Sequence, residues 1–357
     1  MTVRCLRYGA SPNCDNSMPL PRSQLISMEQ TPVYHVISRC VRRQFLCGKD
    51  ASTGKDFSHR RDAIRSRLAK LVTIFAIDVC AYAIMSNHTH IVLWVDQQRA
   101  FEWSDLEVAE RWTQLFAGPA VMQSFVAGHD LSEAQRGAVG THVTRYRQRL
   151  FDISWFMKCL NEPIAREANR EDGVTGHFWE GRFKSQALLD EAAIVSAMAY
   201  VDLNPVRAGM AETPEKSDFT SIQQRLRLFN RTKQEEPRAA PANLEAELGR
   251  LMPFADGGEA DPERSIPIEL QDYLELVDWT GRAVIEGKKG AIPAHLPPIL
   301  ERLKLEPSRY LKFISRHERG FLTAIGAAER MREFAEAVGK SFLKGQTAAA
   351  AMFSPGR

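Results

Sequence analysis

Two apolar runs flank a short polar turn in the first third of the chain. Residues 75–84 form one run, and residues 88–95 form the other, which begins with His88, Thr89 and His90. Two β-rich runs separated by Ser-Asn predict an antiparallel hairpin. Side chains two residues apart on a strand share a face, so His88 and His90 should project side by side while Thr89 points away.

The remaining pattern predicts further elements along the chain. Alternation or helical spacing of apolar positions predicts a strand over 33–40, a helix over 57–74, a helical insertion over about 100–150, a helix over 154–167, a strand over 182–189 and a helix over 190–203 that Asn204-Pro205 stops. The order β-α-β-β-α-β-α predicts an α+β fold with a ferredoxin-like antiparallel sheet and helices on one face.

Composition divides the chain further. Residues 1–30 are polar and predict a tail, and residues 31–230 predict the main domain with its insertion. Residues 231–265 are rich in Pro, Ala, Glu and Gly and predict a linker. Residues 266–357 have a helical pattern and predict a helical C-terminal domain.

The charge is nearly balanced overall but uneven along the chain. The 357 residues carry a net charge of +3, which does not by itself demand a nucleic-acid partner. Basic residues nevertheless cluster between Arg39 and Lys70, between Arg145 and Arg149, and at Arg182 and Lys184. Local basic patches can bind a polyanion, although solvated helix faces would also explain any single patch.

Cysteine spacing and hydropathy indicate the compartment. The six cysteines form no C-x-x-C pair, so free thiols in a reducing cytoplasm are expected rather than a zinc knuckle or disulfides. The N-terminus has no signal-peptide pattern, and no window approaches the roughly 20 apolar residues that span a bilayer. A soluble, intracellular protein without a membrane partner is expected.

The candidate chemistry begins with the histidine pair. Two imidazoles on a strand can hold a divalent cation. Tyr200 lies four residues before Asn204 on a predicted helix, and a phenol beside a cation is a candidate nucleophile. Each residue also has a plainer interpretation: a tyrosine packed at a helix edge, an asparagine that caps the helix before Pro205, and an isolated His-x-His.

Four motifs occur in a definite order along residues 31–210. They are Tyr34-His35-Val36-Ile37-Ser38-Arg39, then Ser86-Asn87-His88-Thr89-His90-Ile91-Val92-Leu93, then residues 176–185 (GHFWEGRFKS), and finally residues 200–209 (YVDLNPVRAG). Together they closely resemble the REP-associated tyrosine transposases, within the single-tyrosine HUH transposase superfamily.

This resemblance implies an activity and its residues. It implies a metal-dependent DNA transposase that nicks and rejoins single-stranded, hairpin-bearing or repetitive palindromic DNA. His88, His90 and Asn204 would bind Mg²⁺ or Mn²⁺. Tyr200 would attack a backbone phosphate and leave a 5′-phosphotyrosine link and a free 3′-hydroxyl. Thr89 departs from the family pattern, in which a larger apolar or aromatic residue separates the histidines.

Further roles follow from the resemblance or from residue type. Basic residues in the first-strand region and in the third motif are candidate DNA contacts: Arg39, Arg42, Arg43, Arg182 and Lys184. His177 and Trp179 could stack on a base, although core packing is the favoured interpretation of Trp179. His35 is interpreted as structural. The resemblance favours a monomer over a dimer and a cytoplasmic, nucleoid-associated location in a bacterium.

Two other function classes remain open. A domesticated copy could bind repetitive palindromic DNA without catalysis, although binding alone places no demand on a nucleophile. A hydrolytic metalloenzyme could use the same histidines, but no nearby motif offers a third carboxylate or histidine ligand. The pattern after residue 265 does not discriminate among DNA recognition, self-association and capping of the first domain.

Overall fold

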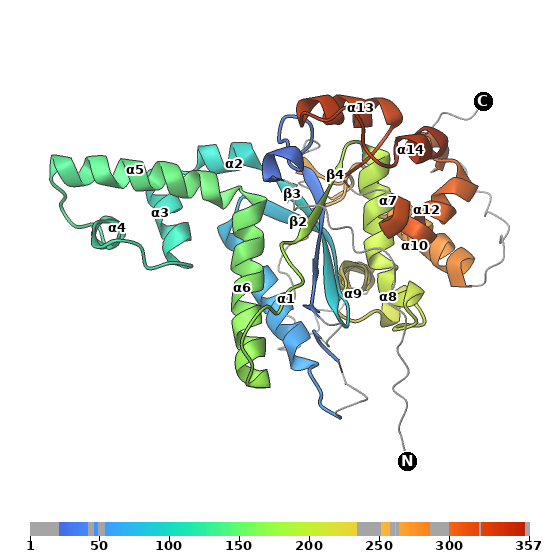
Figure 1. Ribbon diagram of the computed structural model, residues 1–357, viewed down its shortest axis with the longest axis horizontal. Coiled ribbons are helices and arrows are strands. Elements are labelled where there is room, and N and C mark those ends of the chain that lie inside the picture. The colour runs from blue at the N-terminus through green and yellow to red at the C-terminus, as the bar shows by residue number, and fades with distance from the viewer. Residues whose placement is uncertain are drawn as a thin grey trace, which may run out of the picture.

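The fold is that of a computed structural model, which describes residues 21–41, 46–48, 54–233, 251–257, 261, 264–285, 300–320 and 323–353 (Figure 1). The predicted tail up to residue 20 and much of the predicted linker lie outside the described residues. Domain boundaries therefore stay a prediction.

A five-stranded sheet lies at the centre of the molecule. Its strands, in spatial order, are β2 (Ile77–Ile84), β3 (His88–Val95), β1 (Val33–Arg39), β4 (Lys184–Leu188) and β5 (Ala324–Ile325). The first four are antiparallel to their neighbours, whereas β5 runs parallel to β4. The α+β class is confirmed. The expectation of a wholly antiparallel sheet is wrong, because the C-terminal region adds a strand in the same direction as β4.

Helices cover both faces of this sheet (Figure 1). On one face α1 (His59–Ile74) packs against α6 (Ile153–Asp172). On the other face α7 (Glu191–Asp202) contacts β2, β3 and β4, and α9 (Ser221–Lys233) contacts β2. The expectation of helices on one face is therefore wrong. Nearly every residue of α7 is buried, as expected of a helix that is enclosed on all sides.

Local signals in the sequence set the ends of these helices. The Asp152 carboxylate caps α6 by accepting the N–H of Trp155 at 2.9 Å. Gly173 ends α6 in the left-handed conformation, with φ 65°, which glycine adopts without a steric penalty. The Asp190 carboxylate caps α7 by accepting the N–H of Ala193 at 2.8 Å. Both helices therefore begin where the sequence supplies an acceptor.

The predicted helical insertion forms an arm that extends away from the sheet (Figure 1). It consists of α2 (Gln97–Glu102), α3 (Asp105–Thr113), α4 (Ala120–Val126) and α5 (Glu133–Leu150). Capping boxes start two of its helices, with Ser104 at α3 and Ser132 at α5. An ion pair of 2.8 Å between Arg147 and Asp105 joins α5 to the start of α3.

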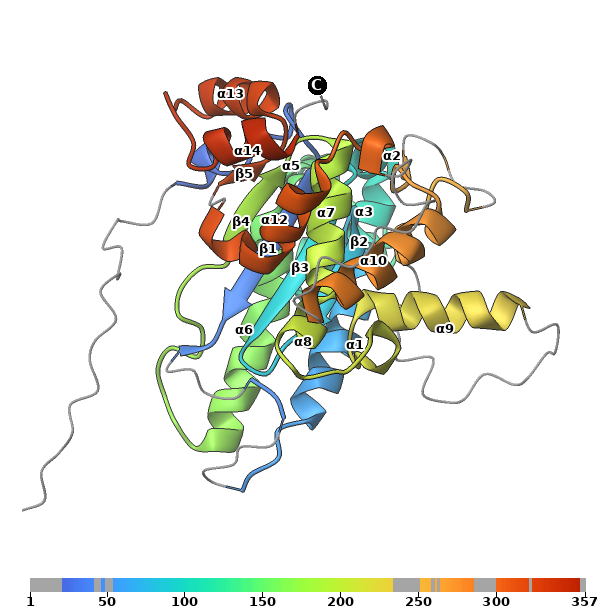
Figure 2. The same ribbon diagram turned by 90° about the vertical axis from the view of Figure 1, so that its right-hand side faces the viewer.

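The C-terminal helices form an outer layer over α7 and the β5 edge of the sheet (Figure 2). The C-terminal helices are α10 (Leu270–Ile285), α12 (Pro307–Gly320), α13 (Ala328–Ala337) and α14 (Gln346–Met352). Earlier in the chain there are also short elements: α8 (Asn204–Arg207) and the 3-10 helices η1 (Arg22–Gln24) and η3 (Pro214–Lys216). Gly326 directly follows β5 and packs closely against the residue after β4: an added Cβ at Gly326 would lie 2.8 Å from the Cβ of Leu189. The region after residue 265 thus packs on the main sheet and contributes β5 to it.

A buried polar cluster ties α10 to α7. The Asp202 carboxylate accepts the hydroxyl of Tyr273 at 2.5 Å, the N–H of Ile222 at 3.0 Å and the hydroxyl of Ser221. Burial raises the pKa of Asp202 to about 6, since desolvation outweighs these three donors and the nearby Arg225. At neutral pH the carboxylate is therefore mostly ionised and able to accept all three hydrogen bonds.

Part of the predicted linker also packs on the sheet. The N–H of Met252 donates to the carbonyl of Val79 on β2 at 2.9 Å, and Met252 and Phe254 are buried.

In the part of the chain that the structure describes, no helix combines the length and apolar character that a membrane crossing requires.

Candidate active site

The predicted hairpin is confirmed, and it places both histidines on the sheet face that α7 covers. In the antiparallel register His90 lies opposite Ile37 of β1, and His88 lies opposite Arg39. The two imidazole centroids are 4.7 Å apart with their planes at 77°. Thr89 is 2% exposed and lies on the other face of β3, as the period of two requires.

A hydrogen-bonded chain of side chains runs from β4 across β1 to His90 of β3. Nδ1 of His35 lies 2.8 Å from Oε1 of Gln186, and Nε2 of His35 lies 2.9 Å from Nδ1 of His90. The rings of His35 and His90 are stacked, with centroids 5.1 Å apart and planes at 18°. His35 and His90 are fully buried and Gln186 nearly so, and the chain therefore fixes the orientation of the His90 ring.

This chain also selects the tautomer of His90. An amide oxygen only accepts hydrogen bonds, so Nδ1 of His35 must be the protonated ring nitrogen, and it donates to Oε1 of Gln186. The unprotonated Nε2 of a neutral His35 then accepts from Nδ1–H of His90, which leaves the lone pair of His90 on Nε2. Metal-binding histidines usually donate their second ring N–H to a carboxylate, a carbonyl or water, and here Nε2 of His35 takes that place.

His88 lies at the mouth of this buried row. It is half-buried, and its Nδ1 lies 2.5 Å from Oδ1 of Asn87. By the same reasoning its Nδ1 carries the proton and its Nε2 carries the lone pair. Both members of the pair thus have a ring nitrogen in the form that a cation requires.

Tyr200 of α7 contacts the histidine row. Its ring meets His90 edge-on at a centroid distance of 5.6 Å and 82°, and it meets His35 at 6.1 Å and 70°. The guanidinium of Arg207 lies 4.7 Å from the centroid of the Tyr200 ring and donates to the carbonyl of Ser315 on α12 at 3.1 Å. Tyr200 is only 2% exposed in this arrangement.

The simpler interpretation of Asn204 was that it caps the tyrosine helix, but Asn204 is not the cap. Leu203 is the residue that caps the C-terminal end of α7, and Asn204 begins the separate short helix α8, followed by Pro205. Asn204 is 7% exposed, and its Nδ2 has no hydrogen-bond partner among the described residues. A buried amide without a partner is uncommon, and a half-turn of this amide would present a hard oxygen ligand instead.

The donor set of this region suits a cation only if the amide takes part. Within the described residues, no group of three His, Cys, Asp or Glu side chains is arranged to hold a metal ion. Two imidazoles and one amide oxygen are ligands that Mn²⁺ and Mg²⁺ accept alongside water and phosphate oxygens. His88, His90 and Asn204 therefore fit such a cation chemically.

The candidate DNA contacts fall into three groups. Arg39 and Lys184 share the sheet face of the histidines, because they alternate in phase with His35 on β1 and Gln186 on β4. Arg182 is exposed in the segment before β4. The remaining two, Arg42 and Arg43, lie outside the described residues.

The third motif mainly serves packing. Nε1–H of Trp179 donates to the carbonyl of Asn161 on α6 at 3.0 Å, and the Trp179 backbone bridges to Cys40. Core packing of Trp179 is therefore confirmed, whereas His177 is exposed.

Sequence reasoning assigned no site role to Gln186 or Arg207 and interpreted His35 as structural. A signal existed for two of them: His35 lies in phase with the first-strand arginine, and Gln186 lies in phase with Lys184. Nothing comparable marked Arg207, since its position over Tyr200 depends on the bend between α7 and α8.

Comparisons with known proteins give little beyond this geometry. No protein-family model matches the chain, and no curated protein matches it. A solved structure described as "Structure of the REP associates tyrosine transposase bound to a REP hairpin" is similar, at 11% identity over 65% of this chain and 94% of that chain, with a TM-score of 0.33. A likeness at this level does not by itself establish a shared fold or activity.

Proposed function

We propose that the protein is a metal-dependent strand transferase that nicks and rejoins single-stranded, hairpin-bearing or palindromic DNA. One observation carries the proposal: the helix-borne Tyr200 meets the strand-borne His90 at a ring-centroid distance of 5.6 Å. Core packing alone gives no reason for three histidine rings and a tyrosine to converge. The motif order along the chain supports the same activity.

The residues have distinct roles in this proposal. His88, His90 and Asn204 would hold Mg²⁺ or Mn²⁺. Such a cation, when bound, supplies positive charge to the non-bridging oxygens of the scissile phosphate. Gln186 and His35 hold the His90 ring in the required orientation and tautomer. Arg207 provides a cation next to the tyrosine.

Tyr200 performs the covalent step. Its Oη attacks the phosphorus of a backbone phosphodiester, a new bond forms between Oη and phosphorus, and the bond from phosphorus to the 3′-oxygen breaks. The phenol loses a proton and the departing 3′-oxygen gains one. The 5′-phosphotyrosine retains a phosphoester bond, so a 3′-hydroxyl can reverse the step and rejoin DNA without ATP.

DNA must gain access to a tyrosine that is 2% exposed. We propose that the segment around Arg207 moves when a phosphate binds, because its guanidinium lies over the Tyr200 ring and also contacts α12. Arg39 and Lys184 on the same sheet face, with Arg182, would attract the strand. Arg42 and Arg43 are assigned the same role from the sequence.

The same proposal covers the finer description of the fold and assembly. The elements β1-α1-β2-β3-α6-β4 with the spatial order β2-β3-β1-β4 form the ferredoxin-like unit. The arm is an insertion before α6, and the layer after residue 265 supports the tyrosine helix. A monomer suffices, since His88, His90, Tyr200 and Asn204 all come from one chain.

The test is to incubate the full chain with Mn²⁺ and a labelled hairpin with a single-stranded flank. A covalent protein–DNA adduct that withstands denaturing electrophoresis is expected. The adduct should disappear with a chelator and in Tyr200→Phe, while hairpin binding persists in both. An adduct of equal yield in Tyr200→Phe would overturn the assignment.

A second candidate is a binder of palindromic DNA that does not cleave it. The burial of Tyr200 favours this alternative, because binding requires no exposed hydroxyl. Tight hairpin binding with no adduct over a wide range of Mn²⁺ concentrations would support it.

A further inference from the structure

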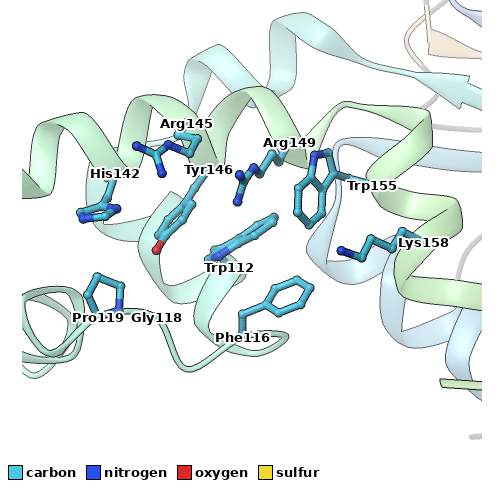
Figure 3. Close-up of a pocket in the computed structure, with 10 residues that line it drawn as sticks. All are labelled: Trp112, Phe116, Gly118, Pro119, His142, Arg145, Tyr146, Arg149, Trp155 and Lys158. Atoms are coloured by element: carbon cyan, nitrogen blue, oxygen red, sulfur yellow. The ribbon is translucent and has the colours of Figure 1, made fainter. Parts of the chain in front are cut away.

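A pocket in the helical arm lies apart from the histidine row. Its volume is about 320 Å³, within the roughly 300–1,000 Å³ range of small-ligand sites. Figure 3 shows its lining, which comes from the end of α3, the turn before α4, the second half of α5 and the start of α6, and which includes Trp112, Phe116, Arg145, Arg149, Trp155 and Lys158. Because α6 covers the sheet face opposite α7, this pocket and Tyr200 lie on different sides of the sheet (Figure 1).

Aromatic rings form the floor of this pocket. Trp112 stacks on Tyr146 at a centroid distance of 4.8 Å and 15°, and on Phe116 at 4.9 Å and 27°. Trp155 meets Phe116 at right angles, with centroids 6.1 Å apart. Trp112 and Tyr146 are buried, whereas Phe116 is 36% exposed and Trp155 is half-buried. The stack therefore ends in rings that solvent can reach.

Cationic side chains surround these rings without acidic partners. The guanidinium of Arg149 lies 4.1 Å from the Trp155 centroid, and Nζ of Lys158 lies 4.8 Å from it. Arg145 also lines the pocket, and none of these three forms an ion pair with a carboxylate of the described residues. Arg147 of the same helix, in contrast, points to Asp105 and forms an ion pair of 2.8 Å.

The two kinds of arginine on α5 have different functions. Arg147 stabilises the fold of the arm, because it also donates to the carbonyls of Ala100 and Trp103. Arg145 and Arg149 leave their charge at the pocket. Arg149 and Lys158 both lie over the half-buried Trp155 ring, and cations this close to each other repel when no anion lies between them.

We propose that this pocket binds an unpaired nucleotide of a single-stranded nucleic acid. The base stacks on Phe116 and Trp155, and the flanking phosphates pair with Arg145, Arg149 and Lys158. Aromatic faces combined with cations are the general means of holding single strands without sequence readout. This inference goes beyond the proposed function, because binding here needs neither a metal ion nor Tyr200.

An acidic protein segment is the main competing occupant. It would use the cations but would gain little from the aromatic faces, whereas a nucleotide uses both. Base stacking therefore distinguishes the two occupants.

The test measures binding of full-length protein to a short single-stranded oligothymidylate that contains one 2-aminopurine, in a chelator-containing buffer. Stacking should quench the fluorescence of 2-aminopurine, and Phe116→Ala should weaken binding about tenfold, within the fivefold to 150-fold that corresponds to the ~1–3 kcal/mol of base–aromatic stacking. Affinity for the strand falls with salt, and Lys158→Gln should make the negative slope of log affinity against log salt shallower by about 0.7.

Matched variants separate the pocket from general effects. Phe342→Ala removes another exposed phenylalanine, which is 61% exposed, and Lys344→Gln removes an exposed lysine that lies outside the basic clusters; both should bind like the wild type. An abasic strand of the same length should bind more weakly.

Three results would overturn the proposal: wild-type affinity in Phe116→Ala, equal losses in Phe116→Ala and Phe342→Ala, or equal affinity for the abasic strand. If Phe116→Ala fails to fold, Lys158→Gln and the abasic strand still decide. Failure of the proposed strand transfer would leave this binding intact, and loss of this binding would leave adduct formation at Tyr200 possible.

Discussion

The ring of Tyr200 on α7 lies edge-on to the ring of His90 on β3, with centroids 5.6 Å apart and planes at 82°. His35 stacks on His90 and also lies edge-on to Tyr200. The proposed nucleophile on a helix and the proposed cation ligand on a strand are thus held by two elements of the core.

The histidine pair should bind a divalent cation in the absence of DNA. Removing a ligand with His90→Ala should weaken Mn²⁺ binding by more than the roughly 10–100-fold typical of losing an outer partner. Titration of Mn²⁺ monitored by electron paramagnetic resonance measures this directly. His177→Ala, which removes an exposed histidine, should leave Mn²⁺ binding unchanged. Equal Mn²⁺ affinities in both variants would rule out His90 as a ligand.

His35 should act as a positioning residue for His90. His35→Ala removes the acceptor for Nδ1–H of His90, so Mn²⁺ affinity should fall roughly 10–100-fold while the protein stays folded. Gln186→Ala should have a smaller effect in the same direction, because it acts through His35. A purely structural role for His35 would instead lower the unfolding temperature without changing the Mn²⁺ affinity of the folded protein.

The Tyr273 hydroxyl should stabilise the junction between α10 and α7. Tyr273→Phe deprives the buried Asp202 carboxylate of a donor, so the free energy of unfolding should fall by about 1–3 kcal/mol. Urea denaturation monitored by circular dichroism measures the change. Tyr310→Phe is the control, because the Tyr310 hydroxyl makes a weaker 3.3 Å contact with Thr280. An equal or larger loss in the control would argue against a special role of Asp202.

Close approach at Gly326 should hold β5 against the sheet. In Gly326→Ala the new Cβ would meet the Cβ of Leu189 at 2.8 Å, so a loss of roughly 1–3 kcal/mol in the free energy of unfolding is expected. Gly137→Ala on α5 meets nothing within 4 Å and should instead stabilise by about 0.5–1 kcal/mol. The same sign for both substitutions would show that the Gly326 contact is relaxed in solution.

Local patterns predicted the parts of the site that depend on local structure. The hairpin, the shared face of His88 and His90, and the helix that carries Tyr200 follow from periods of two and 3.6. Strand β5 could not be predicted in this way, because it has only two residues and forms through pairing with β4. The packing of α7 on the second face of the sheet, and its burial under the C-terminal helices, likewise depend on contacts between distant parts of the chain.

The site shows the same division. Contact between Tyr200 and His90 was expected from the motifs, but the hydrogen bond from His90 to His35 requires the register between β1 and β3. Asn204 was expected at the end of the tyrosine helix. It begins α8 instead, because Pro205 has no N–H to continue the hydrogen bonds of α7 but fits in the first turn of a new helix.

The most direct test of the central claim locates the amino acid that becomes linked to DNA. Full-length protein is incubated with Mn²⁺ and a hairpin-bearing single strand, digested with protease and nuclease, and mapped by mass spectrometry. We expect a nucleotide attached through its 5′-phosphate to Tyr200, present also in Tyr310→Phe and absent in Tyr200→Phe. A nucleotide on any other residue, or an adduct that forms equally without a divalent cation, would contradict it.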